Sequence, residues 1–447
     1  MEKFYFIITY GCQMNVHESE KIAGILRKRG YVSCNAEGEA DIIVFNTCCI
    51  RENAENHAYG NIGALKKLKK AKPRLIIAVG GCMTQQPGAA EKLRKKFPFV
   101  DIVFGTHNLE ELGDLLDKKQ AGKKAVVEIA EGKTVVKEND ADISYRTSYP
   151  NAWVNIMYGC NNFCSYCIVP YVRGRERSRK PENILAEVNA LLDEGYKEIT
   201  LLGQNVNSYG NDTGGEMSFP ALLAEICKRK DKFRLRFMTS NPKDFGEELI
   251  RVVAENEQIC KLIHLPVQAG SDRILKLMNR KYTSGEYLKK VELLRKYIPN
   301  CQLTTDLMVG FPTETEEDFQ DTLDLVRKAD FSTAFTFVYS PRSGTVAAGM
   351  DGQISDEVKK DRIMRLVGLV NSQTREKSSV YLGKTTEILC EDFDSKKNCY
   401  LGRDEYGRMG YFTSSENKIG QFVTLKITDA SGVSLYGEEV KGNTEEE

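Results

Sequence analysis

The stretch Cys160-Asn161-Asn162-Phe163-Cys164-Ser165-Tyr166-Cys167 decides how the rest of the chain is interpreted. Its three cysteines are separated by three and then two residues, so their thiolates can bind three irons of one cubane cluster. Iron-sulfur clusters that only pass electrons usually take four cysteines. The fourth iron would lack a protein ligand, and an open coordination position is how a metal site keeps room for a substrate. The spacing therefore predicts a catalytic iron-sulfur cluster.

A structural zinc site is the main alternative, because Cys-x2-Cys pairs are common in such sites. Zinc wants four ligands and usually finds them in two nearby pairs, but no second pair lies within reach here. The chain has four histidines, and none is within fifty residues of Cys160. The iron-sulfur interpretation is therefore favoured, and stoichiometric zinc in the purified protein would contradict it.

The length of 447 residues allows about three domains at roughly 150 residues each. Hydrophobic residues make up 41% and charged residues 28%, as in ordinary globular proteins, and no apolar run approaches the length of a membrane span. The first residues do not resemble a secretory signal. Thirteen cysteines in such a chain indicate thiolate chemistry in a reducing compartment. A cytoplasmic protein without a membrane partner is expected.

The formal net charge is zero, so any nucleic-acid contact must rest on local basic patches. Residues 61–74 hold six basic residues and no acid, and are expected to form a solvated helix face. The second patch, residues 173–180, holds five basic residues against Glu176 alone and directly follows the cysteine loop. Its arginines are the candidate phosphate contacts: Arg173, Arg175, Arg177 and Arg179.

The first hundred residues alternate short apolar runs with longer amphipathic stretches, which predicts a parallel sheet flanked by helices. The expected strands are Phe4–Thr9, Asp41–Asn46, Leu75–Val79 and Asp101–Phe104. Cys12, Cys48 and Cys82 each follow one of the first three strands, at intervals that suit βαβ units. Carboxyl ends of parallel strands share one edge of a sheet, so a second three-cysteine cluster site is expected there.

Two alternatives remain for these cysteines. Buried cysteines are common small core residues, although three at equivalent strand ends are harder to explain in that way. Cys49 is adjacent to Cys48, and the sequence does not establish which of the two faces the site; we choose Cys48.

A polar linker with a hairpin, around Val126 and Val135, is expected before a second α/β domain. That domain contains six strand candidates separated by helical segments, in fewer residues than a full eight-unit barrel needs. The strands predict a partial (β/α)6 barrel: Val154–Tyr158, Ile199–Leu202, Leu235–Thr239, Leu262–Pro266, Leu303–Val309 and Phe335–Tyr339. Cys160, Cys164 and Cys167 follow the first strand, at the barrel edge where chemistry usually occurs.

Small polar loops follow the later strands of this barrel, including Gly203-Gln204-Asn205, Ser240-Asn241-Pro242 and Gly310-Phe311-Pro312-Thr313. Their residues suit a nucleoside-bearing cofactor. After a helix over Asp356–Ser378, short β-rich runs with glycine and asparagine turns predict a small closed β-barrel. Barrels of this kind often bind RNA, but residues 381–447 carry eight basic and thirteen acidic residues, which argues against a strong phosphate contact.

The chain resembles the methylthiotransferase family of radical S-adenosylmethionine (SAM) enzymes over nearly its whole length. The residues that carry the resemblance are Thr9–Glu20, Phe45–Cys48, Gly80–Cys82, Gly159–Arg179, Leu201–Asn207 and Ile263–Gln268. The resemblance implies a methylthiotransferase domain with an auxiliary [4Fe-4S] cluster over residues 1–118, a linker over 119–147, a radical SAM core over 148–378 and a TRAM domain over 379–442.

The same resemblance implies the roles of the site residues. Cys12, Cys48 and Cys82 would bind the auxiliary cluster, and Cys160, Cys164 and Cys167 the catalytic [4Fe-4S] cluster that binds SAM. Tyr166 occupies the aromatic position of the radical SAM signature. The Gly-Gly-Glu motif of many radical SAM enzymes is replaced by Gly203-Gln204, so Gly203, Gln204 and Ser240 are expected to contact SAM.

The implied reaction is methylthiolation of C2 of N6-(dimethylallyl)adenosine at position 37 of tRNA, next to the anticodon. A 5′-deoxyadenosyl radical would perform the difficult C–H step, and a second SAM would supply the methyl group. Gln13–Val16 and Gly174–Arg179 resemble the dimethylallyladenosine branch; threonylcarbamoyladenosine in tRNA and a ribosomal protein aspartate are the alternative substrates. The implied partners are the tRNA anticodon stem-loop and an electron donor such as flavodoxin or ferredoxin, and a monomer is expected.

Overall fold

The computed structural model describes residues 2–49, 52–130 and 145–440. The chain divides into two compact units, which are described separately. The first contains residues 1–147, 153–163 and 167–184, and the second contains residues 148–152, 164–166 and 185–447. No helix in the described part of the chain is long and apolar enough to cross a membrane.

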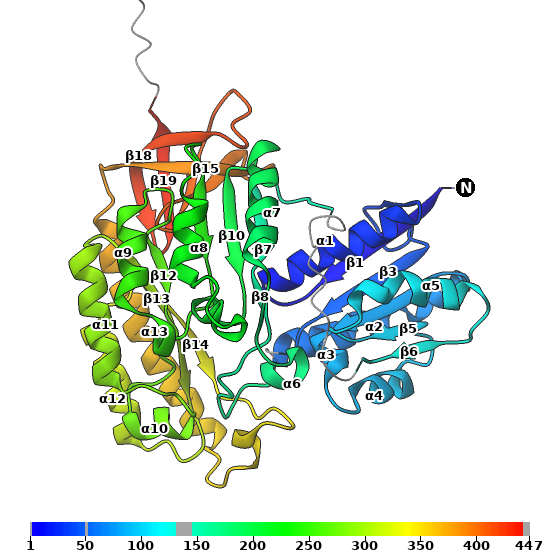
Figure 1. Ribbon diagram of the computed structural model, residues 1–447. Helices are drawn as coiled ribbons and strands as arrows, with labels where there is room; N and C mark the ends of the chain where they lie inside the picture. The colour runs from blue at the N-terminus through cyan, green and yellow to red at the C-terminus, as the bar shows by residue number, and fades with distance from the viewer. Residues whose placement is uncertain (1, 50–51, 131–144, 441–447) are drawn as a thin grey trace, which may run out of the picture. The chain divides into compact units, whose positions relative to one another are not determined.

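The first unit is built on a six-stranded sheet in the order β2-β1-β3-β4-β5-β6, drawn in blue to cyan in Figure 1. Every neighbouring pair in this sheet runs parallel. The strands are β1 (Lys3–Thr9), β2 (Tyr31–Ser33), β3 (Ile42–Thr47), β4 (Ile76–Gly81), β5 (Ile102–Phe104) and β6 (Val126–Glu128). The predicted parallel sheet is confirmed, and all four predicted strands are present.

Alternating residues of the central strands face two hydrophobic cores. Ile43 and Phe45 of β3 pack with residues of α2 (Glu52–Ala71) and α4 (Ala89–Lys96), whereas Ile42 and Val44 pack with α1 (Gln13–Lys28) and α5 (Leu112–Gln120). Burial on both faces explains why β3 is a continuous apolar run. The remaining helical turns of this region are α3 (Cys82–Gln85) and η1 (Leu109–Glu111).

The linker prediction needs one correction. The run around Val126 forms β6, which pairs in parallel with β5 and so is a strand of the sheet rather than part of a linker. A strand of three residues is too short for its hydrophobic pattern to show whether it joins a parallel sheet or a local hairpin. The second predicted run, around Val135, lies outside the described residues. The first unit also includes β8 (Met157–Tyr158), paired antiparallel with β9 (Arg177–Ser178), and α6 (Val169–Arg173).

The second unit contains the strands of the partial barrel. Its parallel pairs are β10 (Glu198–Leu202) with β11 (Arg234–Phe237), and β12 (Leu262–His264) with β13 (Gln302–Val309) and then β14 (Thr333–Val338). A bridge between Leu235 and Ile259 joins the two sets. The first residues of β7 (Asn151–Asn155) belong to this unit as well.

Helices alternate with these strands, as the (β/α)6 prediction requires (Figure 1). They are α7 (Pro181–Asp193), α8 (Phe219–Ile226), α9 (Glu247–Glu255), α10 (Asp272–Leu277), α11 (Ser284–Tyr297), α12 (Glu316–Ala329) and α13 (Asp356–Ser379), with short turns η2 (Val206–Ser208), η3 (Asn211–Thr213), η4 (Pro242–Asp244) and η5 (Val346–Gly349). Capping boxes begin α11 at Thr283 and α12 at Thr315.

The C-terminal strands close into a barrel in the order β15-β16-β17-β19-β18, orange to red in Figure 1. They are β15 (Thr385–Asp394), β16 (Cys399–Asp404), β17 (Met409–Phe412), β18 (Phe422–Ser431) and β19 (Ser434–Glu439). Strand β17 was not predicted, since glycine interrupts its short apolar run. The predicted closed β-barrel is confirmed.

Two arginines of β11 connect this barrel to the rest of the second unit. Arg234 Nη2 donates to the Glu387 carbonyl of β15 at 2.7 Å, and Arg236 Nη2 donates to the Asp404 carbonyl of β16. Arg236 also pairs with the buried carboxylate of Glu198, with 2.8 Å between Nε and Oε1. The β-barrel is thus not a separate compact unit, although the predicted domain boundary at residue 379 marks where its sequence begins.

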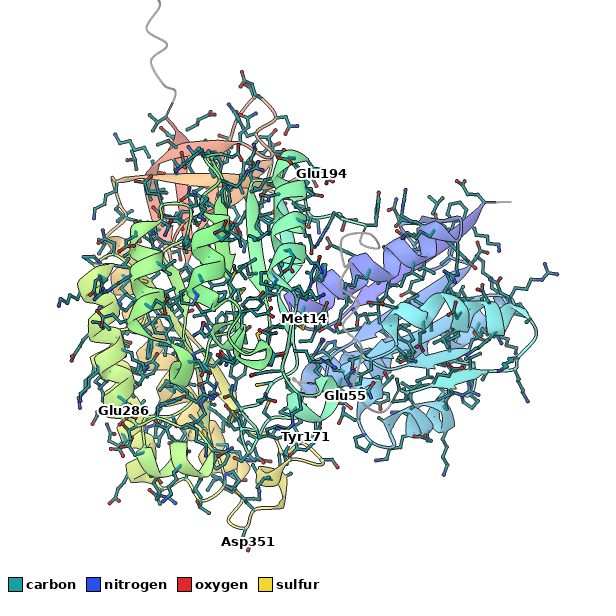
Figure 2. All side chains as sticks on the ribbon, in the orientation of Figure 1. Met14, Glu55, Tyr171, Glu194, Glu286 and Asp351 are labelled. Carbon is teal, nitrogen blue, oxygen red and sulfur yellow. The ribbon has the colours of Figure 1, made fainter. Side chains whose placement is uncertain are left out.

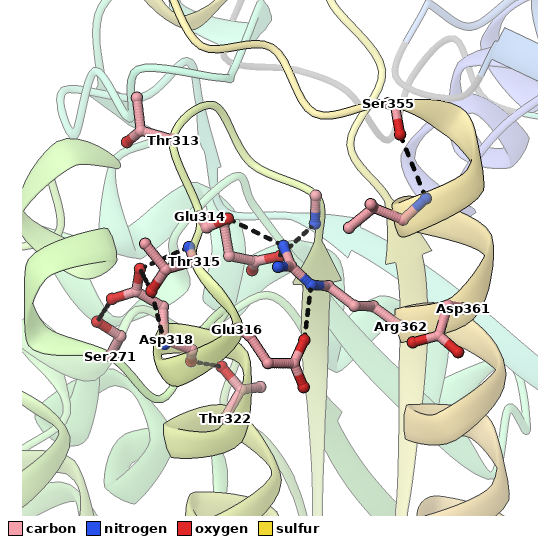
Figure 3. A network of polar contacts seen from close by, with 12 residues as sticks. Ser271, Thr313, Glu314, Thr315, Glu316, Asp318, Thr322, Ser355, Asp361 and Arg362 are labelled. Carbon is pink, nitrogen blue, oxygen red and sulfur yellow. Dashed lines mark hydrogen bonds and ion pairs between the residues drawn. The ribbon is translucent and has the colours of Figure 1, made fainter.

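A buried polar network fixes the start of α12 (Figure 3). Asp318 accepts from the Ser271 hydroxyl at 2.6 Å and completes the capping box with Thr315. Beside it, Arg362 of α13 donates from Nη1 to Glu314 Oε2 at 2.8 Å and to the Glu314 carbonyl at 3.0 Å. The loop after β13 is therefore held to α13 by an ion pair whose two side chains are almost fully buried.

Candidate functional site

The first unit brings the strand-end cysteines to one edge of its sheet. Cys12 directly precedes α1, whose first turn is marked by Met14 in Figure 2. Cys48 follows β3, and Cys82 follows β4 as the first residue of α3. Since β1, β3 and β4 are parallel neighbours, the three cysteines lie at the same carboxyl edge, as the sequence predicted.

Cys48 and Cys49 point to different neighbours. Cys48 packs against Gly11, which has φ +117° and has no room for a side chain: a Cβ there would lie 2.7 Å from the Cys48 Cβ. Cys49 is hydrogen-bonded to Cys82 and belongs to the hydrophobic core beneath the sheet edge. Cys48 therefore lies beside the Cys12 loop and Cys49 beside Cys82, and both thiols are near the expected ligands.

A buried arginine faces these thiols. Arg173, at the end of α6, donates from Nη1 to Glu18 Oε1 at 2.6 Å and from Nη2 to Asn15 Oδ1 at 3.5 Å. Asn15 Oδ1 also accepts from the Cys12 thiol at 3.5 Å. The hydrogen bond from Cys49 lowers the pKa of the Cys82 thiol, and the Arg173 guanidinium lowers it further, against the effect of burial. The Arg173 guanidinium, paired with Glu18, thus lies beside the thiols of this edge.

The burial of this arginine corrects part of the phosphate prediction. Arg173 is 5% exposed and Arg179 is 1% exposed, with its Nη1 donating to the Asn155 carbonyl at 2.6 Å. Neither side chain is available to a phosphate in this structure. Arg175 is exposed and lies 4.3 Å from the Phe163 ring centroid, and Arg177 is partly exposed. The two outer arginines of the run that was predicted as one basic patch are thus buried, and the two inner arginines are at least partly exposed.

Replacement of Arg173 by methionine is expected to lower the reduction potential of a cluster bound at this edge. Removing a nearby positive charge makes the addition of an electron less favourable. The measurement is a redox titration followed by electron paramagnetic resonance, in a background where Cys160, Cys164 and Cys167 are alanine, with iron content determined in parallel.

Arg175→Met is the matched control for that measurement, because Arg175 is two residues away and exposed. It should leave the potential unchanged. Equal potentials for Arg173→Met and Arg175→Met, at equal iron content, would refute an electrostatic role for Arg173.

The loop with Cys160, Cys164 and Cys167 alternates between the two units: Cys164–Tyr166 belongs to the second, and the residues on both sides belong to the first. Within the first unit, Gly159 has φ +73° and approaches the Arg175 carbonyl, while the Cys160 amide donates to the Gly174 carbonyl at 3.1 Å. Asn162 Nδ2 lies 3.5 Å from the Cys160 sulfur. The conformation on this side of the loop is thus supported by backbone contacts with Gly174 and Arg175 and by side-chain hydrogen bonds of Asn161 and Asn162.

Within the second unit, the sequence analysis missed Arg280. Its Nη1 donates to the Cys164 sulfur at 3.3 Å, its Nη2 to the Pro266 carbonyl at 2.7 Å and its Nε to Tyr282 Oη at 2.6 Å. Burial raises the pKa of Tyr282 to about 12, so this phenol stays neutral. Only the tertiary fold brings Arg280 to the cysteine loop, and no spacing in the sequence indicates it.

The predicted SAM-contact loops lie at the carboxyl ends of β10 and β11. Gly203 is buried, Gln204 is partly exposed, and the Ser240 hydroxyl donates to Asn207 Oδ1 at 3.2 Å. Thr239, Gln268 and Thr313, which follow β11, β12 and β13, have φ values of +72°, +76° and +66°. Non-glycine residues rarely adopt such angles, and they are frequent at functional sites. The structure places Tyr166 in the same unit as Gly203, Gln204 and Ser240.

A second group missed by the sequence analysis lies on β12, β13 and β14. His264 Nδ1 is 3.0 Å from Thr304 Oγ1, its Nε2 is 3.7 Å from Asp306 Oδ2, and its ring meets the edge of Phe335. Phe335 is 50% exposed although it lies in the middle of a strand. A large aromatic ring uncovered on β14 offers an apolar contact surface.

The donor set fits iron-sulfur clusters. No disulfide joins any of the cysteines in the described part of the chain, so none of the candidates is committed to one. Within residues 2–49, 52–130 and 145–440, no three His, Cys, Asp or Glu side chains converge as they would around a single metal ion. The three thiolates of a cubane site lie farther apart than the ligands of a single ion, because each thiolate binds a different iron.

Three family models match the chain. They are the Radical SAM superfamily over residues 154–326, the uncharacterized protein family UPF0004 over residues 4–105 and the TRAM domain over residues 379–440. These ranges correspond to most of the partial barrel, to the first five strands of the six-stranded sheet and to the closed β-barrel.

Curated relatives match almost end to end. The tRNA-2-methylthio-N(6)-dimethylallyladenosine synthase of Caldicellulosiruptor saccharolyticus is 52% identical over 98% of this chain and 92% of its own length. The synthase of the same name from Clostridium botulinum (strain Langeland) is 50% identical, covering 98% and 97%. That from Thermoanaerobacter pseudethanolicus is 48% identical, covering 98% and 93%.

Solved structures share the fold at low identity. The radical SAM methyltransferase TsrM from Kitasatospora setae, solved with cobalamin and a [4Fe-4S] cluster, has a TM-score of 0.57 at 14% identity, over 78% of this chain and 77% of that one. The cobalamin-dependent radical SAM enzyme OxsB has a TM-score of 0.52 at 14% identity, over 83% and 56%.

Proposed function

The chain belongs to the family of tRNA-2-methylthio-N(6)-dimethylallyladenosine synthases, which are radical SAM methylthiotransferases, and we propose how its residues divide the work of that reaction. The enzyme replaces the C2 hydrogen of N6-(dimethylallyl)adenosine in tRNA with a methylthio group. It uses SAM and two [4Fe-4S] clusters. Threonylcarbamoyladenosine and a ribosomal protein aspartate, the alternative substrates, are not favoured, because the curated relatives that match 98% of the chain carry the dimethylallyladenosine name.

In our proposal, Cys160, Cys164 and Cys167 hold the cluster that binds SAM, and Cys12, Cys48 and Cys82 hold the auxiliary cluster. The observation that supports it is the position of the strand-end cysteines at one edge of a parallel sheet, in a chain that also contains the three-cysteine loop. When bound, the first cluster supplies the electron that cleaves SAM. Arg280 then stabilises the negative charge at Cys164, and Arg173 does the same at Cys12 and Cys82.

Tyr166, Gly203, Gln204 and Ser240 are proposed to seat SAM, and Phe335 with His264 to contact the substrate base. Gln204 and Ser240 follow adjacent parallel strands, whose loops are joined by the Ser240 to Asn207 hydrogen bond. Weaker SAM binding by Gln204→Ala and Ser240→Ala, measured by equilibrium dialysis, would support the assignment, and wild-type SAM cleavage in both variants would remove it.

Arg175 and Arg177 are proposed as contacts to tRNA phosphates. Each phosphate contact contributes to the salt dependence of binding, so replacing one basic residue should reduce the slope of log K against log salt by about 1. Unchanged tRNA affinity and slope in the double Arg175→Gln, Arg177→Gln variant would refute this. The electron donor is proposed to be a small protein such as flavodoxin or ferredoxin, and the active species a monomer.

The experiment that tests the function is mass spectrometry of nucleosides from isopentenylated tRNA. The tRNA is incubated anaerobically with reconstituted protein, SAM and a strong reductant. A methylthio-isopentenyladenosine peak is expected. Accumulation of 5′-deoxyadenosine alone would keep the radical SAM chemistry and overturn the substrate, and threonylcarbamoylated tRNA would then be the next substrate.

A further inference from the structure

The closed β-barrel has the strand order of an OB-fold. Its first three strands, β15, β16 and β17, are followed in the barrel by the fifth and then the fourth, β19 and β18, and β17 runs parallel to β19. OB-folds bind oligonucleotides and oligosaccharides on the face of their second and third strands, and with the loops joining strands one to two and four to five. In this chain that face lies on β16 and β17, and the two loops are residues 395–398 and 432–433.

One of the two loops is already bound to a neighbouring helix. Ser378 of α13 donates to the Gly432 carbonyl, so the loop between β18 and β19 is attached to a helix of the same unit. The loop between β15 and β16 carries Lys396 and Lys397, and the Lys397 side chain is 65% exposed. The available part of the binding face is therefore the one beside this first loop.

Two tyrosines lie on this part of the barrel. Tyr411 of β17 is paired in register with Tyr436 of β19, and their rings stack with 5.2 Å between centroids and 18° between planes. The neighbours of each along the strand, Phe412 and Leu435, are buried in the barrel core, so both tyrosines point outward. Tyr436 is 41% exposed. Lys397 Nζ lies 5.2 Å from the centroid of the Tyr411 ring.

We propose that Tyr411 and Tyr436, with Lys397 at their edge, form a platform on which an unpaired base of the tRNA substrate stacks. The identity of this partner rests on the proposed function, because the substrate of the proposed reaction is a tRNA whose anticodon loop is single-stranded. Aromatic side chains in positively charged grooves are the usual means by which OB-folds bind single strands.

Charge favours stacking over phosphate binding on this barrel. Residues 379–440 contain seven basic and ten acidic residues. Lys418 is paired with Glu416 and Glu439, Arg403 with Glu391 and Lys397 with Asp394, so three of the seven basic residues already face carboxylates of the barrel. A flat aromatic surface binds a base without requiring a basic field. The acidic composition of the barrel is thereby reconciled with an RNA partner.

The experiment measures tRNA affinity of the reconstituted full-length enzyme at several salt concentrations. Tyr436→Ala and Tyr436→Leu are expected to weaken binding about tenfold, with the slope of log K against log salt unchanged. Leucine preserves the apolar bulk on the strand but has no ring for a base to stack on. Tyr436→Phe is expected to retain the affinity.

Tyr297→Ala is the matched control. Tyr297 is also partly exposed and has a cationic side chain near its ring, with Arg251 at 5.6 Å, but it lies on α11. This variant should bind tRNA like the wild type. Thermal unfolding of every variant establishes that the barrel is intact.

The outcomes separate this proposal from the proposed function. If wild-type protein forms methylthio-isopentenyladenosine while Tyr436→Leu binds tRNA like Tyr297→Ala, the platform is refuted and the function stands. A reduced salt slope in Tyr436→Leu would also refute stacking, because it indicates a lost phosphate contact. If the wild type forms no product but Tyr436→Leu loses affinity, the platform stands and the function fails.

Discussion

A chain in which Cys160, Cys164 and Cys167 are all alanine is expected to bind about half the iron and sulfide of the wild type and to cleave no SAM. The sequence has no other cysteine between Cys82 and Cys227, so no thiol adjacent in the sequence can replace the three that are removed. The site formed by Cys12, Cys48 and Cys82 lies in another part of the sequence and is expected to keep its cluster. Iron and sulfide analysis after anaerobic reconstitution, with chromatography of 5′-deoxyadenosine, provides the measurement.

The reciprocal variant, in which Cys12, Cys48 and Cys82 are alanine, is the control. It should also lose about half of the iron, yet retain SAM cleavage while forming no methylthio product. Cys49→Ser tests the neighbouring thiol and should keep the full iron content. Full iron content in Cys48→Ser, with loss in Cys49→Ser, would transfer the ligand role from Cys48 to Cys49.

Replacement of Arg362 by methionine is expected to lower the free energy of unfolding by about 3–5 kcal/mol. Arg362 pairs with Glu314, and the side chains are 6% and 1% exposed (Figure 3). Methionine fills a similar volume but leaves the Glu314 carboxylate buried without its partner. Arg365→Met, three residues along α13, removes the exposed pairs with Glu316 and Asp361 and a cation–π contact with Phe319, and should cost about 1 kcal/mol. Urea unfolding of the two variants measures the difference.

The loss in free energy of unfolding caused by Arg362→Met should depend on pH. Burial raises the pKa of Glu314, while the Gly310 amide and Arg362 oppose that rise. Without Arg362 the pKa rises further. A carboxyl group with a higher pKa in the folded than in the unfolded protein loses its contribution to stability as pH rises through the folded pKa. The deficit is therefore expected to be largest at neutral pH and to decrease on acidification. A deficit that does not vary between pH 5 and 8 would contradict a charge effect.

The cysteine positions were predictable because each follows a strand with a clear apolar run, and the carboxyl ends of parallel strands must meet. The strands β2 and β17 were missed, and β6 was predicted only as part of a hairpin, because a few residues at a sheet edge or around a glycine carry almost no periodic signal. The basic run after the cysteine loop was predicted as one patch. Burial of Arg173 depends on Glu18, more than 150 residues earlier in the sequence, and such long-range pairs leave no local pattern. Arg280 beside Cys164 was missed for the same reason.

The two arginines of β11 have a consequence for dissecting the enzyme by truncation. A chain ending at residue 378 would lose the carbonyls of Glu387 and Asp404 that now accept from Arg234 and Arg236. Arg236 and the buried Glu198 would then be exposed to water at the amino end of the barrel strands. Such a shortened enzyme is expected to misfold or aggregate as well as to bind tRNA poorly. Its failure would wrongly be ascribed to RNA recognition, so single substitutions on the outer surface are the sound way to study the β-barrel.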